Sequence, residues 1–350
     1  MKLARDARLV HPQWKCCMSL LSQIQNSDAP LREWMATRLP YIGQVIKTLR
    51  VEMPSDLDVR TIRPIAGNPP TTLGIAIDYR IRYRMGITPS PDFVAAKGAM
   101  IQLGRYLAEY DPDNIALDSF PFKIYRDARF PEFILPNLSN PGVAQYAPSA
   151  FFWFLWELTS KTSPVGRTLD VKSEERLSRA CAVLALYDEV FRNGDVWPTS
   201  PLASVSIESS AEELMAIIPN AWVKDIAAVC TRLFAEVPLV GRAVLNPKFA
   251  LSVAIGGADA DFILDGCLVD IKSTVNPKID IAWLRQVLGY TLLDTDDAYG
   301  INSVGILLSR QGVMTRWPLE PLLDNLAGPG RTSLKVMRSE IVDLLADGDD

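Results

Sequence analysis

The sequence has little histidine: His11 is the single one among 350 residues. Histidine is the usual base or ligand in Ser-His-Asp, Cys-His and zinc-dependent catalysis, so these chemistries are excluded unless His11 itself takes part. Any catalytic chemistry is therefore expected to depend on carboxylates and lysine.

Cysteine is scarce as well. The five cysteines are odd in number, none is spaced as Cys-x-x-Cys, and Cys16 and Cys17 are adjacent. This pattern suits neither a disulfide framework nor a zinc knuckle. We expect reduced thiols and a cytoplasmic location, because reducing compartments keep thiols unpaired.

Long apolar runs are missing. The most apolar aromatic run, from Ala150 to Trp156, is closed by Glu157, which is too short a run to cross a bilayer and predicts a buried helix. The first residues, Met1 to Asp6, lack the apolar core of a signal peptide. We therefore expect no membrane partner; the oligomeric state stays open.

Charge is distributed unevenly along the chain. The net charge is −5, but residues 1–84 hold 13 Lys/Arg against 7 Asp/Glu, a balance of +6, which leaves −11 for the rest. A basic first quarter is compatible with a polyanionic partner such as nucleic acid. Charges scattered over solvated helix faces are the alternative.

Helical signals dominate the first two thirds of the chain. Helices are predicted from Ser90 to about Tyr110, from Ser173 to a stop at Gly194, after a capping box at Ser210, and from Ala221. Residues 111–149 are rich in proline and asparagine and predict a long irregular connection.

The pattern changes near residue 248. A short apolar run from Phe249 to Ile255 is followed by a hairpin pattern over 259–272, a helix near 281–293 and a buried strand at 303–308. The predicted order is β-β-β-α-β.

Asp265-Gly266 between two alternating apolar runs is a strong signal for a two-residue hairpin turn. The register that follows has these facing pairs: Leu264–Cys267, Ile263–Leu268, Phe262–Val269, Asp261–Asp270 and Asp259–Lys272. One face would then be wholly apolar, formed by Ala260, Phe262, Leu264, Cys267, Val269 and Ile271.

Two facing aspartates repel each other unless a positive charge lies between them. Lys272 is one candidate for that charge, and Mg²⁺, which prefers oxygen ligands, is another. The alternative is a solvated hairpin face with an incidental charge cluster.

Asp261, followed on the next strand by Asp270-Ile271-Lys272, resembles the core motif of the PD-(D/E)XK nuclease superfamily. The helix that follows carries Gln286-Val287-Leu288-Gly289-Tyr290, which is similar to the Gln-x-x-x-Tyr motif of the RecB-like branch. The resemblance implies an α/β (α+β) fold: a restriction-endonuclease-like core with a small mixed sheet, here embedded in a large helical body. A packed core aromatic is the alternative for Tyr290.

The RecB-like branch often carries Gly-x-x-x-His on an early helix, where this chain has Gly74-Ile75-Ala76-Ile77-Asp78. Asp78 is thus a second-tier candidate for a metal ligand. The alternation of apolar and charged residues over 75–84 would favour a strand, whereas the resemblance implies a helix, which we adopt.

The resemblance implies an Mg²⁺-dependent nuclease, with Mn²⁺ expected to substitute and DNA favoured over RNA as the nucleic acid. Asp261, Asp270 and the backbone carbonyl of Ile271 would hold the metal. Lys272 would position or help deprotonate the attacking water, and Gln286 and Tyr290 would hold the nucleic-acid backbone or orient Lys272.

Two alternatives remain open: a nuclease-like domain that no longer cuts and serves as a nucleic-acid-binding or assembly module, and a helical interaction protein. The predicted organisation is an N-terminal helical segment (1–84), a helical insertion (85–245) packed on the core, the nuclease core (246–318) and C-terminal helices (319–350). Arg80, Arg82 and Arg84 should lie on the same side as Lys272, because a polyanion must reach the metal.

Overall fold

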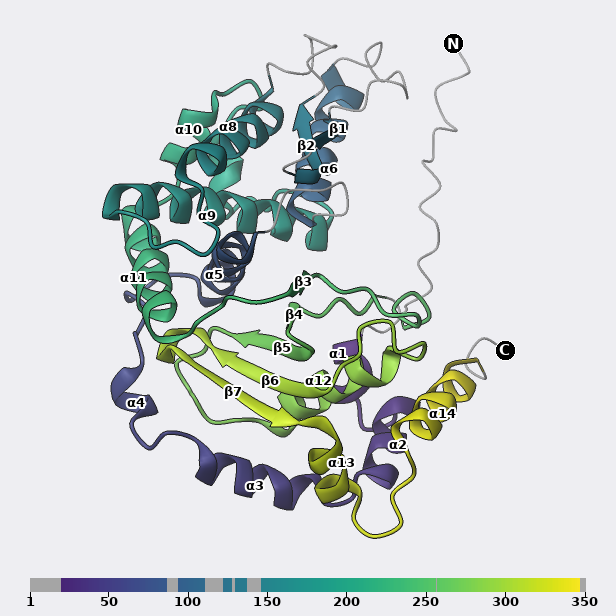
Figure 1. Cartoon of the computed structure of the whole chain (residues 1–350). Coiled ribbons are helices and arrows are strands. Elements are labelled where there is room, and N and C mark those ends of the chain that lie inside the picture. Colours follow the sequence, from purple (N-terminus) through teal and green to yellow (C-terminus); the bar gives the residue numbers. More distant parts are fainter. Residues whose placement is uncertain are drawn as a thin grey trace, which may run out of the picture.

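A five-stranded mixed sheet lies at the centre of the lower half of the molecule (Figure 1). The structure, a computed structural model, describes residues 20–86, 94–110, 122–127, 130–136, 146–255 and 257–346. The strands follow one another in the order β3 (Ala243–Leu245), β4 (Phe262–Leu264), β5 (Cys267–Lys272), β6 (Ser303–Leu308) and β7 (Val313–Pro318). Most of the other described residues are helical, so the predicted α+β class is confirmed.

Only β5 and β6 are parallel; the other neighbours in this sheet are antiparallel. Helix α12 (Ile281–Leu293) connects the parallel pair, as a parallel connection requires a crossover. The predicted order β-β-β-α-β, with its helix at 281–293 and strand at 303–308, is confirmed, and β7 extends the sheet.

The position predicted for the first strand is wrong. Residues 251–255 form turns, and the strand beside β4 is β3, further upstream. The Ser252 hydroxyl explains the turn, since it accepts from the Phe249 N–H at 2.9 Å and donates to the Ala258 carbonyl at 2.8 Å. These bonds fold the segment back on itself.

The hairpin turn is confirmed. Asp265 and Gly266 both have positive φ, 49° and 76°, as a type I′ turn requires. The predicted register holds for the three pairs nearest the turn, and the paired ladder ends at Phe262–Val269. Beyond it the prediction is wrong for Asp259, which bridges to Lys248 of the preceding segment and not to Lys272.

Each face of the sheet has its own hydrophobic core. Phe262, Leu264, Cys267 and Val269 belong to the cluster shared with the helical body, and Ile271 packs against it. Ile263 and Leu268 belong to the cluster on the opposite side. The predicted apolar face is therefore confirmed except for Ala260, which lies in the second cluster, because the chain leaves the strand before Phe262.

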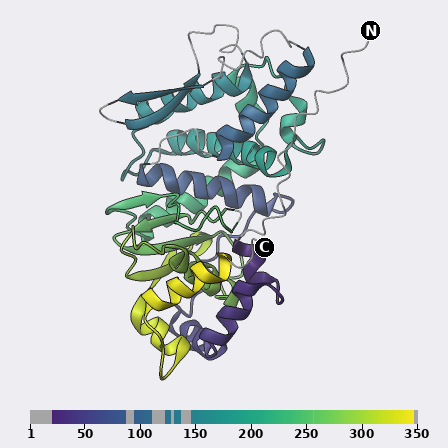
Figure 2. The ribbon, with the colours of Figure 1, turned by 90° about the vertical axis from the view of Figure 1, so that its right-hand side faces the viewer.

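The helical body covers the first face. Figure 2 shows α5 lying directly on the sheet and the remaining helices stacked beyond it. The body comprises α5 (Pro70–Met85), α6 (Val94–Tyr110), α8 (Ala147–Thr162), α9 (Val171–Asn193), α10 (Ala211–Ala216) and α11 (Asn220–Glu236). The buried ion pair of Arg310 with Asp225, at 2.7 Å, ties the 3-10 turn η3 (Ser309–Gln311) after β6 to α11.

Sequence expectations for the body are mostly confirmed. The capping box at Ser210 forms, and α9 ends at Gly194 with φ 72°. The cap of α9 is Asp170 rather than Ser173, because the Asp170 carboxylate accepts the Ser173 N–H. Strands β1 (Phe122–Asp127) and β2 (Phe130–Pro136) form an antiparallel pair where an irregular connection was predicted. The predicted helix start at Ser90 lies outside the described residues.

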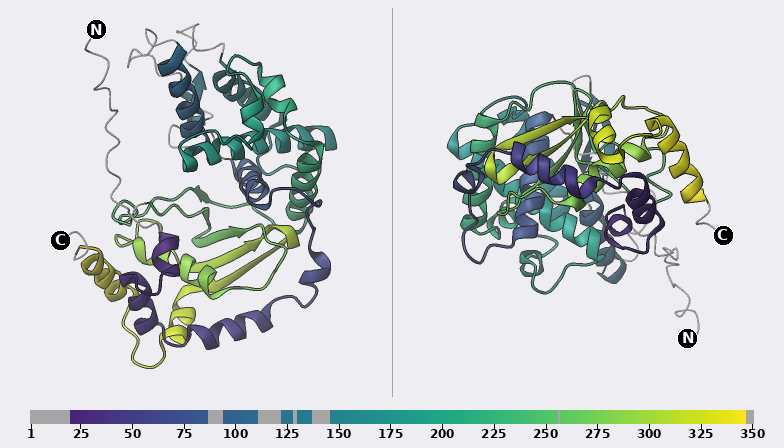
Figure 3. Two further views of the ribbon diagram at one scale, coloured as in Figure 1. Left: turned by 180° about the vertical axis from the view of Figure 1, so that it is seen from behind. Right: turned by 90° about the horizontal axis from the view of Figure 1, so that it is seen from below.

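A second helical layer covers the other face. It comprises α1 (Leu20–Gln25), α2 (Pro30–Arg38), α3 (Ile42–Glu52), α12, α13 (Leu319–Ala327) and α14 (Leu334–Ala346), while the short α4 (Leu57–Arg60) and the 3-10 turn η2 (Pro201–Ser204) lie in connections. Seen from behind, α1 lies against α12 (Figure 3). Among the described residues no helix is long and apolar enough to span a membrane. Cys181, Cys230 and Cys267 are buried and unbridged.

Candidate active site

The candidate residues meet at the end of β5, where its partner β4 has already stopped. Beyond the last pair of the ladder, the N–H of Ile271 is bonded by a side chain: Asp261 Oδ2 accepts it at 2.6 Å. The main chain of Asp261 stays attached to the end of β3, because its carbonyl accepts the Asn246 N–H at 3.2 Å. This anchoring fixes the Asp261 carboxylate beside the Asp-x-Lys segment.

Asp270 and Lys272 are linked to α12 by a short polar chain. Lys272 Nζ lies 2.7 Å from Asp270 Oδ2 and donates to Gln286 Oε1 at 2.9 Å. Gln286 Nε2 in turn donates to the Tyr290 hydroxyl at 3.1 Å. The four-residue spacing of Gln286 and Tyr290 places both on one face of α12. The chain holds the Lys272 ammonium beside Asp270.

Tyr290 is packed as a core aromatic, and its hydroxyl also belongs to this polar chain. Its ring is buried and stacks on Phe249 with the centroids 5.8 Å apart, as a core aromatic does. Its hydroxyl accepts from Gln286 at the rim of the site. The Lys272 ammonium also lies over the Trp283 ring, 5.7 Å from its centroid. Two aromatic residues of α12 therefore lie close to Lys272: Trp283 contacts it directly, and Tyr290 is linked to it through Gln286.

Helix α5 brings Asp78 to the same place. The helix is formed as the resemblance implied, with a proline in its first turn and Gly86 in the left-handed conformation at its end. The alternating pattern misleads because α5 is buried between the sheet and the body, so apolar residues occur on several of its sides. Asp78 and Asp261 interact electrostatically across this junction.

The prediction for the three arginines of α5 is right for one and wrong for two. Arg82 points at the site, within 3.2 Å of Asp261 Oδ1. Arg80 is fully buried in an ion pair with Glu174 at 2.6 Å. Arg84 lies over the Phe234 ring at 5.2 Å from its centroid, on the same side as Arg80. Their positions two residues from Arg82 turn both away from the sheet.

The three carboxylates sit in a poorly solvated, acid-rich place. The pKa of Asp270 is raised to about 7; burial is the main cause, Lys272 opposes it, and the charges of Asp261 and Asp78 add to the effect of burial. Burial and the charge of Asp261 likewise raise the pKa of Asp78 to about 6, against the attraction of Arg82. The carboxyls of Asp270 and Asp78 thus bind their protons more tightly than in water, because the local cations do not compensate fully.

A cavity of about 1180 Å³ opens over these groups. Its lining includes Asp78, Asp261, Ile271, Lys272, Gln286 and Tyr290. Asp270 lies behind them, with its side chain 4% exposed. Every predicted site residue is therefore either in the wall of one cavity or in direct contact with it.

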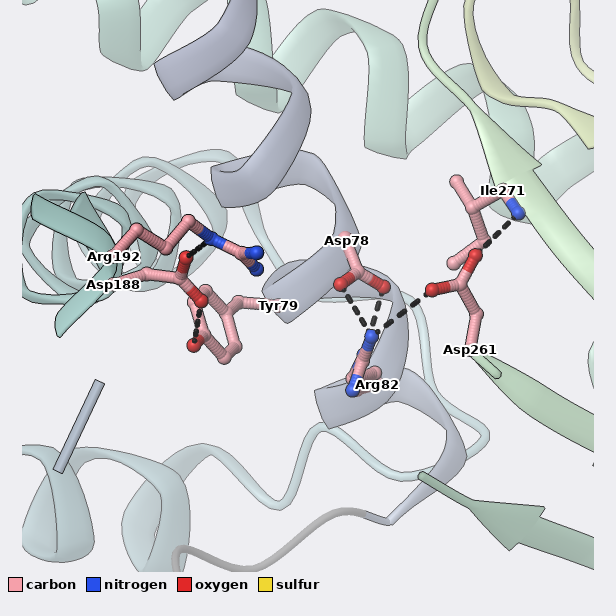
Figure 4. Close-up of polar contacts among 7 residues, drawn as sticks. All are labelled: Asp78, Tyr79, Arg82, Asp188, Arg192, Asp261 and Ile271. Atoms are coloured by element: carbon pink, nitrogen blue, oxygen red, sulfur yellow. Dashed lines mark hydrogen bonds and ion pairs between the residues drawn. The ribbon is translucent and has the colours of Figure 1, made fainter. Parts of the chain in front are cut away.

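Sequence reasoning missed a second polar pair on this wall. Asp188 of α9 accepts from the Tyr79 hydroxyl at 2.9 Å and pairs with Arg192, so that α9 and α5 are bridged next to Asp78 and Arg82 (Figure 4). The signal available was the i, i+4 spacing of Asp188–Arg192 and of Asp78–Arg82, which is typical of ion pairs on one helix face.

Oxygen donors for a metal are present, although the described residues hold no group of three or more His, Cys, Asp or Glu side chains arranged around one ion. Mg²⁺ needs only one or two protein carboxylates besides water and substrate oxygens. Asp270 Oδ2 is buried and, despite its ion pair with Lys272, has no well-directed hydrogen bond from a described residue. Three acidic side chains face two cations here, Arg82 and Lys272. The donor set and this charge balance fit a divalent cation.

Comparison with known proteins finds no matching family model, no similar curated protein and no similar solved structure.

Proposed function

We propose that the protein is a metal-dependent nuclease that hydrolyses phosphodiester bonds of nucleic acid, with DNA as the favoured substrate. The observation that carries the proposal is the convergence of Asp261, Asp270 and Lys272 with the Gln286–Tyr290 pair beside one cavity. The β-β-β-α-β order of the sheet adds support for a PD-(D/E)XK, restriction-endonuclease-like core. A cytoplasmic location is part of the proposal, in keeping with the unbridged cysteines.

The residues that would hold Mg²⁺ or Mn²⁺ are Asp261, Asp270 and the backbone carbonyl of Ile271. When bound, such a metal polarises the scissile phosphate and lowers the pKa of a water molecule. Lys272 supplies a fixed positive charge beside Asp270, and that charge offsets the negative charge developing on the phosphate in the transition state.

Gln286 and Tyr290 act on Lys272 rather than on the carboxylates. Gln286 accepts from the ammonium and is itself held by donating to the Tyr290 hydroxyl. This arrangement restricts the long Lys272 side chain to one position, and preorganised charge contributes more to catalysis than mobile charge.

The test is incubation of the purified protein with single- and double-stranded DNA and RNA in Mg²⁺, Mn²⁺ or EDTA. Cleavage should require the metal and should vanish in Lys272→Ala. The matched control is Lys278→Ala, because Lys278 is exposed and does not line the cavity. Metal-independent cleavage, or equal activity of the two variants, would refute the proposal.

One observation favours a second candidate, a nucleic-acid-binding or assembly module that does not cut. Arg82 and Lys272 already pair with the acidic residues, so part of the negative charge is compensated internally. This candidate predicts nucleic-acid binding without cleavage in any metal, and binding that is unchanged by EDTA.

A further inference from the structure

Arg82 occupies the space between two carboxylates from different elements. Its Nε donates to Asp78 Oδ1 at 2.8 Å, and its Nη2 lies 2.6 Å from Asp78 Oδ2 and 3.2 Å from Asp261 Oδ1 (Figure 4). The side chain is 11% exposed. A guanidinium group thus bridges α5 to the start of β4 at a point where the proposed reaction needs a metal near Asp261.

The two contacts of Arg82 differ in strength. The fork to Asp78 uses two nitrogens and both carboxylate oxygens within one helix, which is the favourable bidentate geometry. The contact with Asp261 uses one nitrogen at a longer distance. If another cation approaches, the Arg82–Asp261 contact should therefore break before the Arg82–Asp78 contact.

Asp261 has no oxygen without a donor. Oδ2 accepts the Ile271 N–H, and Oδ1 accepts from Arg82. A divalent cation bound to Asp261 would lie close to the Arg82 charge and be repelled by it, and the repulsion is strong where water is partly excluded. Metal binding and the Arg82–Asp261 contact therefore oppose each other.

We propose that Arg82 is a positioning residue that competes with the metal for Asp261 and, once displaced, remains anchored on Asp78 and binds a phosphate oxygen of the nucleic acid. Asp78 then serves as the anchor of Arg82 instead of a metal ligand. The inference rests on the proposed function, because it takes the metal and the nucleic acid from it. Guanidinium groups suit this exchange, since the same donor fork matches carboxylate and phosphate oxygens.

The neighbouring arginines sharpen the assignment. Arg80 is held by both oxygens of Glu174 and cannot turn to the cavity without leaving that buried acid unpaired. Arg192 lines the cavity but pairs with Asp188 and has no contact with Asp261. Arg82 alone among these three touches a proposed metal ligand.

The experiment measures Mn²⁺ affinity without nucleic acid, by titration calorimetry or by the electron paramagnetic resonance signal of free Mn²⁺. Arg82→Gln removes the charge, Arg82→Lys keeps it without the fork, and Arg192→Gln removes the equivalent charge of the second i, i+4 pair on the same wall. We expect Arg82→Gln to bind Mn²⁺ about tenfold more tightly than the wild type, because the repulsion between the guanidinium charge and the metal is removed. Arg82→Lys should lie between them, and Arg192→Gln should match the wild type.

Nucleic-acid binding should change in the opposite direction. In Ca²⁺, used as a non-catalytic probe metal, Arg82→Gln should bind an oligonucleotide more weakly and with a salt dependence reduced by about one phosphate contact. A purely structural role of Arg82 would weaken both metal and nucleic-acid binding together, so opposite shifts separate the two explanations.

Equal or weaker Mn²⁺ affinity in Arg82→Gln, while the wild type binds Mn²⁺ and cuts nucleic acid, would overturn this inference and leave the proposed function standing. If neither protein bound Mn²⁺ and the wild type cut nothing, the proposed function would fail, and this inference with it.

Discussion

At the scale of single residues, the ionised form of Asp270 is unfavourable for stability but required for the proposed function. It is nearly inaccessible, yet the proposed chemistry needs it ionised. Its pKa is raised to about 7 from 3.8, so the metal-free fold holds a proton that the unfolded chain releases. Between these two values the native state binds more protons, and its stability therefore falls as the pH rises.

Replacing Asp270 with Asn should remove this penalty. In EDTA, the stability advantage of Asp270→Asn over the wild type should be larger at pH 8 than at pH 5, by roughly 3 kcal/mol, because pH 5 lies about two units below the Asp270 pKa of about 7 and each pKa unit corresponds to about 1.4 kcal/mol. Chemical denaturation at both pH values measures the difference. In millimolar Mg²⁺ or Mn²⁺ the wild type should gain stability and the variant should gain less.

The same substitution should abolish cleavage, so function and stability change in opposite directions at one position. A solvated, incidental charge cluster does not predict this. If the variant cuts normally, or if the melting temperature of the wild type does not change when the metal is added, Asp270 is not a metal-binding catalytic residue.

Tyr290 allows the packing and site roles of one side chain to be separated. Tyr290→Phe keeps the ring on Phe249 and deletes the hydroxyl that Gln286 donates to. We expect a stability loss within about 1 kcal/mol but a clear loss of cleavage rate, because Gln286 no longer holds Lys272 in place. Tyr290→Leu, which also loses the stacking, is the control. If Tyr290→Phe retains full activity, Tyr290 is a core aromatic only.

At the scale of secondary-structure elements, α6 and α9 approach each other closely in the helical body. A Cβ atom added to Gly98 would lie 1.8 Å from the Tyr187 carbonyl oxygen, which is backbone and cannot move aside. Gly104, on the same helix, has nothing within 4 Å of such an atom. The two glycines therefore make a matched pair.

Gly98→Ala should destabilise the protein by about 1 to 3 kcal/mol, as overpacking of a tight contact does. Gly104→Ala should instead stabilise it by roughly 0.5 to 1 kcal/mol, because alanine is the better helix former. Thermal melts of the two variants give the comparison. Destabilisation of both by the same amount would contradict the close contact between Gly98 and Tyr187.

These elements also show what sequence can and cannot predict. The Asp265-Gly266 turn, α12 and β6 have strong local signals, and all three are found where predicted. Strand β3 spans three half-buried residues and depends on pairing with β4, so no local pattern revealed it. The direction of Arg82 follows from which side of α5 meets the sheet, which is a tertiary property.

At the scale of the whole molecule, the site lies between the two hydrophobic cores that cover the two faces of the sheet. The sheet is shared by both cores, and α5 closes one side of the cavity while α12 closes the other. Among the basic residues of the first quarter of the chain that the structure describes, Arg80, Arg84 and Arg38 are engaged elsewhere. For the proposed nucleic-acid substrate, the described lining of the cavity offers four cationic side chains, those of Arg82, Arg192, Lys248 and Lys272.

Under the proposed function, we expect the cavity to favour a single strand over a duplex. Its volume of about 1180 Å³ is close to that of small-ligand sites, roughly 300 to 1,000 Å³. The Asp261 side chain is only 23% exposed and Asp270 lies deeper. A stiff duplex keeps its phosphates on the outside of a rod, whereas a single strand can unstack and insert individual nucleotides. Trp283 offers an aromatic ring in the cavity lining for such contacts.

We therefore expect a labelled single strand to be cut at least about tenfold faster than the same strand in a blunt duplex, because opening the duplex costs a few kcal/mol for each unpaired step. A duplex with a short single-stranded overhang is the control and should be cut at the overhang. The cleavage rate on the single strand should fall only moderately between 50 and 200 mM salt. The loss of binding affinity with rising salt scales with the number of phosphate contacts, and the cavity offers few of them. Equal rates on the blunt duplex and the single strand would mean that the carboxylates are reached from outside the cavity, and the path of the substrate would have to be redrawn.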